Sequence, residues 1–276
     1  MNIDFHRHFH LGPGEWVLDL GAGDGRHTVE ASRWPCHVVA VEIDPNLLRL
    51  ARAYVPREDS AGAGGRLRRG TADFILADAE HLPFKDVAFD KVLCTEVLEH
   101  IPDDKAGIRE LYRVAKAGSQ VAVSVPRAWP ERVNWTLSWE YWHTPGGHVR
   151  IYRPGEMAGY LGAQGFDVQF TRYRHAFQAF YWFLRCTFGK DNERSLILHS
   201  VWRFINWYHN TRPALIERIE AVANLVAGKD MILYARKPGG PAEGEAARQE
   251  RSAPLSTPRF EAAPPVGEAA GGGGDA

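Results

Sequence analysis

Two short segments of this chain have residue types and spacings suited to chemistry. In residues 21–25, GAGDG, glycines alternate directly after an apolar run. Glycines so placed let the backbone approach a ligand, and a helix beginning near Arg26 would direct its unpaired N–H groups at a polar or anionic group. Residues 96–100, EVLEH, combine two carboxylates with an imidazole. Such side chains can transfer protons or bind a metal ion.

A repeating order of apolar runs and helical segments would position these residues. The run at residues 16–20 leads into the glycine turn, and the run at 37–43 is followed by Asp44-Pro45, a typical N-cap and first-turn proline. Three further strands are predicted at residues 72–78, 89–95 and 120–125. Strands that alternate with helices predict an α/β fold with a doubly wound parallel sheet, in which ligands bind at the carboxyl ends of the strands.

Four predicted strands end in polar side chains. Asp19 ends the first strand, Glu42 the second, Asp78 the third and Thr95 the fourth. The carboxyl ends of parallel strands share one edge of a sheet, so we expect these side chains to lie near one another. Glu42 also follows the glycine turn at the distance where a carboxylate accepts hydrogen bonds from a ribose diol. The sequence therefore predicts a nucleoside-containing ligand at this edge.

The segments DLGAGDG, VVAVEIDP, ADAEHLPF and FDKVLCTEVLEHI, in this order, resemble the class I S-adenosylmethionine-dependent methyltransferases, in particular type 11-like members. The resemblance covers about residues 14–168 and 231–236. It implies a Rossmann-like seven-stranded sheet whose last strand is antiparallel, with residues 166–173 and 230–237 as the closing pair. A nicotinamide-dependent Rossmann oxidoreductase is one alternative, although its usual G-x-G-x-x-G differs from the G-x-G-x-G found here. A non-catalytic module that binds S-adenosylmethionine is the other.

The resemblance also implies how the donor, S-adenosylmethionine, is bound. Asp19 and the backbone of the glycine turn would hold the methionine part, and Glu42 the ribose hydroxyls. Asp78 and the next residue would contact the adenine edge, and Ile43 would pack on the adenine face. The full set of expected cofactor-binding residues is Asp19, Gly21, Ala22, Gly23, Glu42, Ile43, Asp78, Ala79 and Thr95.

The expected reaction is an in-line displacement in which an acceptor atom attacks the methyl carbon as the sulfur departs. Orientation in a dry site supplies most of the catalysis, and a base is needed only if the acceptor loses a proton. If the turn after the fourth strand is helical, Glu96, Glu99 and His100 project from one side of it. Residues 146–147, both glycine, precede His148 in a loop.

These four side chains resemble the set that binds a divalent cation in quinone-biosynthesis O-methyltransferases and small-RNA 2′-O-methyltransferases. The resemblance implies Glu96, Glu99, His100 and His148 as ligands of a cation such as Mg2+, which would orient an acceptor hydroxyl and lower its pKa. The E-x-x-E-H pattern also occurs in family members without a metal. In that case His100 or His148 is expected to act as the catalytic base.

An aromatic-rich region follows the fifth strand. Between Trp129 and Tyr208 lie 20 of the chain's Trp, Tyr and Phe residues, and the tryptophans at 135, 139 and 142 are spaced as one helical face. Residues 174–229 form a predicted helical insertion between strands six and seven, with helices near 176–188, 195–209 and 213–227. We expect a lid that excludes water and shapes a pocket for a small-molecule, lipid-like or glycan acceptor, methylated at oxygen. Most of these rings are expected to form the lid's own core.

Composition bounds the remaining expectations. A methyltransferase domain is expected over residues 1–237, and a disordered tail over 238–276, which is dominated by Pro, Gly and Ala. The net charge of −1 argues against a nucleic-acid partner, and the Arg-rich loop at 57–69 is its only support. Three widely spaced cysteines and the absence of an apolar leader predict a cytoplasmic protein with buried thiols. Arginines among the aromatic residues favour peripheral contact with a membrane, and no oligomeric state is indicated.

Overall fold

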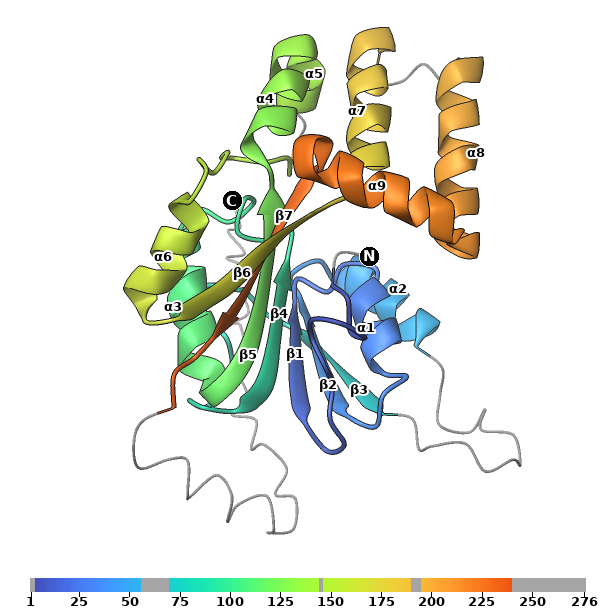
Figure 1. The fold of residues 1–276 in the computed structure, drawn as a ribbon. Coiled ribbons are helices and arrows are strands. Elements are labelled where there is room, and N and C mark those ends of the chain that lie inside the picture. The colour runs from blue at the N-terminus through green and yellow to red at the C-terminus, as the bar shows by residue number, and fades with distance from the viewer. Residues whose placement is uncertain (1–2, 56–69, 144–145, 190–194, 240–276) are drawn as a thin grey trace, which may run out of the picture.

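The computed structural model describes residues 3–55, 70–143, 146–189 and 195–239, and its centre is one seven-stranded sheet (Figure 1). The strand order is β3-β2-β1-β4-β5-β7-β6, and β7 runs antiparallel to both of its neighbours, β5 and β6. The expected α/β sheet with an antiparallel last strand is confirmed. The strands are β1 (Trp16–Leu20), β2 (His37–Glu42), β3 (Thr71–Leu76), β4 (Phe89–Thr95), β5 (Ala115–Pro126), β6 (Asp167–Arg174) and β7 (Asp230–Arg236).

The helices that connect the parallel strands cover the sheet. They are α1 (Arg26–Ala31), α2 (Pro45–Tyr54), α3 (Asp104–Val114) and α6 (Glu156–Gln164). Asp44 caps α2 as predicted, because its side chain accepts a hydrogen bond from the backbone N–H of Asn46 at 2.7 Å. Each helix returns the chain so that the next parallel strand again ends at the same edge of the sheet. The polar strand ends are thereby brought together.

Both faces of the sheet are buried. Leu18 packs with α3 and α6 residues in one apolar cluster, whereas its neighbour Val17 packs in a second cluster. Successive side chains of a strand point to opposite faces, so the two clusters lie on opposite sides of β1. The second cluster includes Ile3, Phe5 and Phe9, which are almost fully buried. The segment before β1 is therefore part of the core.

Within the described residues, five helices lie beyond the edge of the sheet where β5 leads into α4 (Figure 1). They are α4 (Ala128–Leu137), α5 (Trp139–Trp142), α7 (Ala176–Phe188), α8 (Leu196–Thr211) and α9 (Ala214–Ala227). The last three lie between β6 and β7, where the insertion was predicted. This arrangement places aromatic helices over the carboxyl ends of the parallel strands.

The single tryptophan face predicted for residues 135–142 is interrupted. Ser138 has extended backbone, with φ −138°, so it ends α4 and begins α5. Trp135 and Trp142 still stack, with ring centroids 5.4 Å apart, but Trp139 is 69 % exposed and stacks on His143 instead. The prediction that Trp139 shares one helical face with Trp135 and Trp142 was therefore wrong.

Three other expectations concern the cysteines, the segments at 57–69 and after 237, and the membrane. All three cysteines are buried, as predicted. The Arg-rich loop at 57–69 and nearly all of the predicted tail, from residue 240 onward, lie outside the described residues. Within the described part of the chain, no helix combines the length and the apolarity that crossing a bilayer requires.

Candidate functional site

The glycine turn after β1 leaves its backbone accessible from one side. Gly21, Gly23 and Gly25 have φ of +69°, +56° and +85°, a region that L side chains rarely adopt. A Cβ on Gly21 would lie 2.1 Å from Cγ2 of Val97, whereas a Cβ on Gly23 would meet no atom within 4 Å. The turn is thus packed against the protein at Gly21 and open at Gly23. A ligand can approach the backbone there.

Asp19, two residues before this turn, has an unsatisfied carboxylate oxygen. Its side chain is fully buried, and its Oδ2 accepts a hydrogen bond from Thr28 Oγ1 at 2.6 Å. Among the described residues, Oδ1 has no hydrogen-bond partner. Burial raises the pKa of Asp19 to about 6. An unpaired oxygen at this position fits a cationic group of a ligand, such as the ammonium of the expected donor.

Glu42 joins the end of β2 to the glycine turn. Its Oε2 accepts a hydrogen bond from the backbone N–H of Gly23 at 2.8 Å. Its Oε1 accepts from the N–H groups of Ile43 and Asp44, at 2.9 and 3.1 Å. A carboxylate can accept about four hydrogen bonds, so one acceptor position remains for a hydroxyl group. From the sequence, Glu42 was predicted only to bind the ribose. The structure shows that it also holds the glycine turn through its hydrogen bond with Gly23.

The remaining expected donor residues lie along the same edge. Ile43 is 67 % exposed, which leaves apolar surface for a planar base. Asp78 Oδ1 accepts a hydrogen bond from the backbone of Glu80 at 2.9 Å, and Ala79 beside it is buried. Thr95 Oγ1 lies 3.3 Å from His27 Nδ1 at the end of β4. These positions, with buried Ala22 in the turn, follow the carboxyl ends of β1 to β4.

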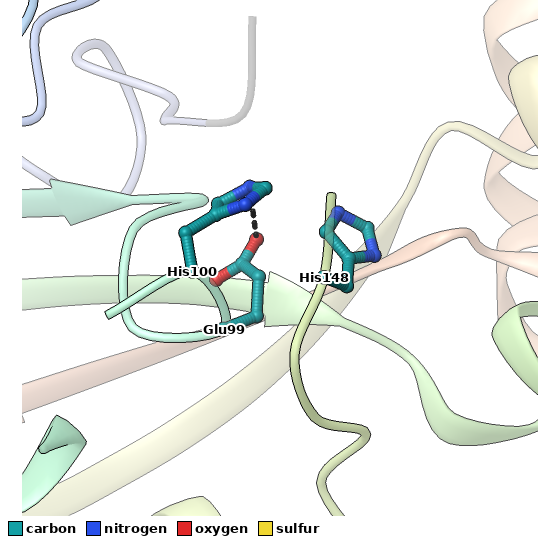
Figure 2. Close-up of side chains that lie close together, drawn as sticks. All are labelled: Glu99, His100 and His148. Atoms are coloured by element: carbon teal, nitrogen blue, oxygen red, sulfur yellow. Dashed lines mark ion pairs between the residues drawn. The ribbon is translucent and has the colours of Figure 1, made fainter. Parts of the chain in front are cut away.

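Glu99 and His100 follow β4 in the chain and form a cluster with His148, in which the ligand atoms of the three residues lie within 4.8 Å of one another (Figure 2). Glu99 is fully buried, and neither of its carboxylate oxygens has a hydrogen-bond partner in the described structure. His100 Nε2 lies 3.9 Å from Glu99 Oε1. Burial, together with the negative charge of Glu96, raises the pKa of Glu99 well above its ordinary value. A buried carboxyl group that accepts no hydrogen bond and lies beside two imidazoles is typical of a cation or proton-transfer site.

Hydrogen bonds fix the orientation of both imidazoles. His100 Nδ1 lies 3.2 Å from the carbonyl oxygen of Gly147, and His148 Nδ1 lies 2.6 Å from Glu131 Oε1. Because carbonyl and carboxylate oxygens accept hydrogen bonds, each neutral ring carries its proton on Nδ1 and a lone pair on Nε2. Metal-binding histidines are usually held in this way, and so are histidines that act as bases.

Glu96 does not join the cluster. Residues 96–100 form a turn rather than a helix, and Glu96 has a φ of +56°. Its carboxylate accepts a hydrogen bond from Ser124 Oγ at 2.8 Å and pairs with Lys229 Nζ at 3.4 Å. Of the four expected metal ligands, the structure thus brings together Glu99, His100 and His148, and it directs Glu96 to Lys229.

Lys229 and Glu131 are candidate site residues that the sequence reasoning missed. Lys229 Nζ lies 2.9 Å from Asp230 Oδ1, and Asp230 Oδ2 lies 2.6 Å from His175 Nδ1. Burial alone would lower the pKa of Lys229, but Asp230 and Glu96 hold it well above its ordinary value, so Lys229 remains charged. The charged pair Lys229-Asp230 at the start of the otherwise mostly apolar β7 was the available sequence signal for Lys229. No comparable sequence signal marked Glu131, because it lies within an aromatic helix.

Comparisons with known proteins place this geometry in context. Residues 18–123 match the protein family described as "Methyltransferase domain". The demethylmenaquinone methyltransferase of Corynebacterium urealyticum is 34 % identical over 118 residues, which are 43 % of this chain and 44 % of that protein. The protein of the same name from Lactiplantibacillus plantarum is 30 % identical over 155 residues, 52 % of this chain and 62 % of that protein. The chain thus spans less than two thirds of the length of these relatives.

One solved structure shows how far the likeness in fold extends. A putative methyltransferase from Bacillus halodurans superposes with a TM-score of 0.54 at 20 % identity, covering 83 % of this chain and 95 % of that one. At this identity the superposition concerns the fold alone, which includes the sheet that aligns the strand ends.

Proposed function

This chain belongs to the class I S-adenosylmethionine-dependent methyltransferases, and on that premise we propose that it catalyses methyl transfer. The match over residues 18–123 and the sheet with an antiparallel β7 are the basis of that premise. The family implies S-adenosylmethionine as the donor. The open backbone at Gly23, the unpaired Asp19 oxygen and the remaining acceptor position of Glu42 fit its methionine and ribose parts.

In the proposed reaction an acceptor oxygen attacks the methyl carbon of the donor. The new C–O bond forms as the C–S bond breaks, and S-adenosylhomocysteine leaves with the electron pair on sulfur. The acceptor hydroxyl loses a proton, which the site must accept. The acceptor is a small-molecule, lipid-like or glycan compound. Relatives named demethylmenaquinone methyltransferases support a small-molecule acceptor.

The cluster of Glu99, His100 and His148 is the observation that supports transfer to oxygen. We propose that these residues hold a divalent cation, which would orient the acceptor hydroxyl and lower its pKa. Two of the three donor atoms are imidazole nitrogens, because Glu96 is bound to Lys229. Imidazole suits first-row ions such as Zn2+ better than Mg2+, which prefers oxygen ligands.

A metal-free version of the same site is the competing mechanism. In it, His148 Nε2 accepts the hydroxyl proton while Glu131 holds Nδ1 and stabilises the imidazolium. Both versions predict that His148→Ala loses most of the transfer activity. They differ in whether a chelator affects the reaction.

Transfer of labelled methyl from S-adenosylmethionine into extractable small molecules and lipids of a host extract tests the function. We expect labelled product, a loss of roughly 10²-fold after chelation, and recovery with a first-row divalent ion. Glu99→Gln should be equally inactive and should not recover, whereas Glu217→Gln, a control on α9, should behave as the wild type. Full activity after chelation would remove the cation and leave the Glu131–His148 pair as the base.

The alternative functions give different results in the same preparation. A nicotinamide-dependent oxidoreductase would be stabilised against heat by NAD and not by S-adenosylmethionine. A non-catalytic module would be stabilised by S-adenosylmethionine but would label no product in any extract.

We further propose that the protein contacts a membrane surface peripherally, where a lipid-like acceptor would be available. The outward face of α9 supports this contact: it carries the exposed aliphatic residues Leu215, Ile219, Val222, Leu225 and Val226.

A further inference from the structure

Glu96 is a carboxylate close to the cluster of Figure 2 that does not belong to it. It lies three residues before Glu99 in the turn at residues 96–100. The two carboxyl groups are near neighbours, because the negative charge of Glu96 is one of the causes that raise the pKa of Glu99. Within the described residues, the cluster nevertheless comprises Glu99, His100 and His148 without Glu96. A side chain suited to binding a metal is therefore held away from the other three.

Two interactions hold the carboxylate of Glu96 in its direction. Its Oε2 pairs with Lys229 Nζ at 3.4 Å, and its Oε1 accepts a hydrogen bond from Ser124 Oγ at 2.8 Å. The backbone of Glu96 has a φ of +56°, which is unfavourable for a residue other than glycine. Such a conformation persists only where the surrounding structure imposes it. The partners of Glu96 thus determine where its carboxylate lies.

Lys229 is fixed independently of Glu96. Its Nζ lies 2.9 Å from Asp230 Oδ1, and the second oxygen of Asp230 lies 2.6 Å from His175 Nδ1. The side chain of Lys229 is only 15 % exposed, so water and salt screen its charge weakly. Its ammonium group is therefore a fixed cation, and it binds Glu96 on the side away from the cluster.

The position of Glu96 affects which ion the cluster prefers. Without Glu96, the ligands are one carboxylate and two imidazoles, a set that suits first-row ions such as Zn2+. With Glu96 there would be two carboxylates, and Mg2+ prefers oxygen ligands. The positive charge of Lys229 repels all divalent ions alike, so charge alone does not distinguish Mg2+ from Zn2+. The difference between the ions depends on the carboxylate that Lys229 withholds.

We propose that Lys229 sets the metal preference of the cluster, because by binding Glu96 it withholds the second carboxylate and disfavours Mg2+. The inference rests on the proposed function, in which Glu99, His100 and His148 hold a divalent cation. Lys229 is a positioning residue that acts through Glu96 and does not touch the ion. Loss of Lys229 makes available the four-ligand set that the sequence predicted.

Calorimetric titration of the full-length protein with Zn2+ and with Mg2+ tests the proposal through the ratio of the two dissociation constants. Only the binding that Glu99→Gln abolishes is assigned to the cluster. We expect the wild type to favour Zn2+ and Lys229→Met to shift the ratio towards Mg2+ by roughly tenfold, the usual size of effects from residues behind the ligands. Lys229→Arg retains the charge and the pair with Glu96, so it should keep the wild-type ratio. Lys116→Met removes another ion-paired lysine, at the start of β5, and is the matched control.

Two further variants separate the role of Glu96 from the loss of charge. Glu96→Ala alone should keep the wild-type ratio, because Glu96 is not a ligand while Lys229 binds it. Added to Lys229→Met, it should cancel the gain for Mg2+. Ser124→Ala removes the other hydrogen bond to Glu96 and should shift the ratio in the same direction by a smaller amount. It provides the test if circular dichroism shows that Lys229→Met does not fold.

The proposal is overturned if the wild type favours Mg2+, if Lys229→Met leaves the ratio unchanged, or if the gain for Mg2+ survives Glu96→Ala. An unchanged ratio in Ser124→Ala overturns it where that variant provides the test. Binding of Zn2+ with a ratio that these variants do not alter rejects only the role of Lys229. If neither ion binds at the cluster, the cation of the proposed function is rejected as well, and labelled methyl transfer still tests the reaction itself.

Discussion

Asp19 is a buried carboxyl group whose protonation should be visible in the stability of the protein. Its pKa is about 6 in the folded chain, against an ordinary value of 3.8, because burial disfavours the charged form. Between about pH 4 and 6 the folded state therefore keeps a proton that the unfolded state has lost. The free energy of unfolding contributed by this group must fall as pH rises through that window, by on the order of 3 kcal/mol.

Asp19→Asn should remove this pH dependence. Urea unfolding at pH 4, 5, 6 and 7 would measure it, with the difference between wild type and variant isolating Asp19 from other titrating groups. We expect the variant to gain stability relative to the wild type as the pH rises. Parallel curves for the two proteins would contradict the assignment of a raised pKa to Asp19.

Single residues differed in how well the sequence predicted them. Asp19 and Glu42 lie at strand ends, where local pattern and sheet topology together fix the position. Glu131 meets His148 across 17 residues, and Lys229 meets Glu96 across 133, so these pairs depend on the folding of separate elements. The expectation for Glu96 assumed a helical turn, and its left-handed backbone instead directs the side chain towards Lys229.

At the scale of elements, the packing of α1 on α2 depends on a close approach at Gly25. A Cβ there would lie 2.7 Å from Cβ and 2.9 Å from Cα of Ala51 in α2, and Gly25 also has a φ of +85°. Gly25→Ala should lower the free energy of unfolding by about 2–4 kcal/mol, from backbone strain and overpacking together. Chemical denaturation measures the change.

Gly23→Ala is the matched control for this prediction. Gly23 also has positive φ, at +56°, but no atom would contact its Cβ within 4 Å, so strain alone should cost about 1 kcal/mol. Equal losses for the two variants would mean that contact with Ala51 does not limit the packing of α1 against α2.

Elements with strong local signals were the most predictable. The apolar runs gave the central strands, and Asp44-Pro45 marked the start of α2. The break at Ser138 was not predictable from tryptophan spacing, because a helical period says nothing about where one helix stops and another begins. The predicted insertion is present as three helices, but its action as a lid stays a prediction.

Over the whole molecule the charge nearly cancels, at −1, but its distribution is uneven. Three arginines are exposed in this region: Arg203 on α8, Arg212 directly after α8, and Arg218 on α9. Of the acidic side chains on these helices, Glu220 is buried and Glu217 pairs with Arg212 at 3.8 Å. The expectation of no nucleic-acid partner rests on the net charge alone, and net charge does not reveal this local basic region.

α9 differs from most surface helices because it places polar side chains inward and aliphatic side chains outward. Asn224 faces inward and caps α7, accepting a hydrogen bond from the backbone of Ala176 at 2.9 Å. Val222 and Val226 face outward with 68 % and 71 % exposure. Aliphatic side chains beside exposed arginines suit the interface of an anionic bilayer, whereas a second copy of the same face would bring like charges together.

Vesicle co-sedimentation tests this contact. We expect binding to vesicles that contain phosphatidylglycerol, weaker binding to pure phosphatidylcholine, and weakening with added salt, because arginines supply part of the attraction. Val222→Glu should reduce the partition coefficient roughly tenfold, since it replaces inserted apolar surface with a charge. Leu50→Glu on α2, at a position 41 % exposed, is the control and should partition as the wild type. If Val222→Glu and wild type partition equally, α9 is not the membrane-binding face.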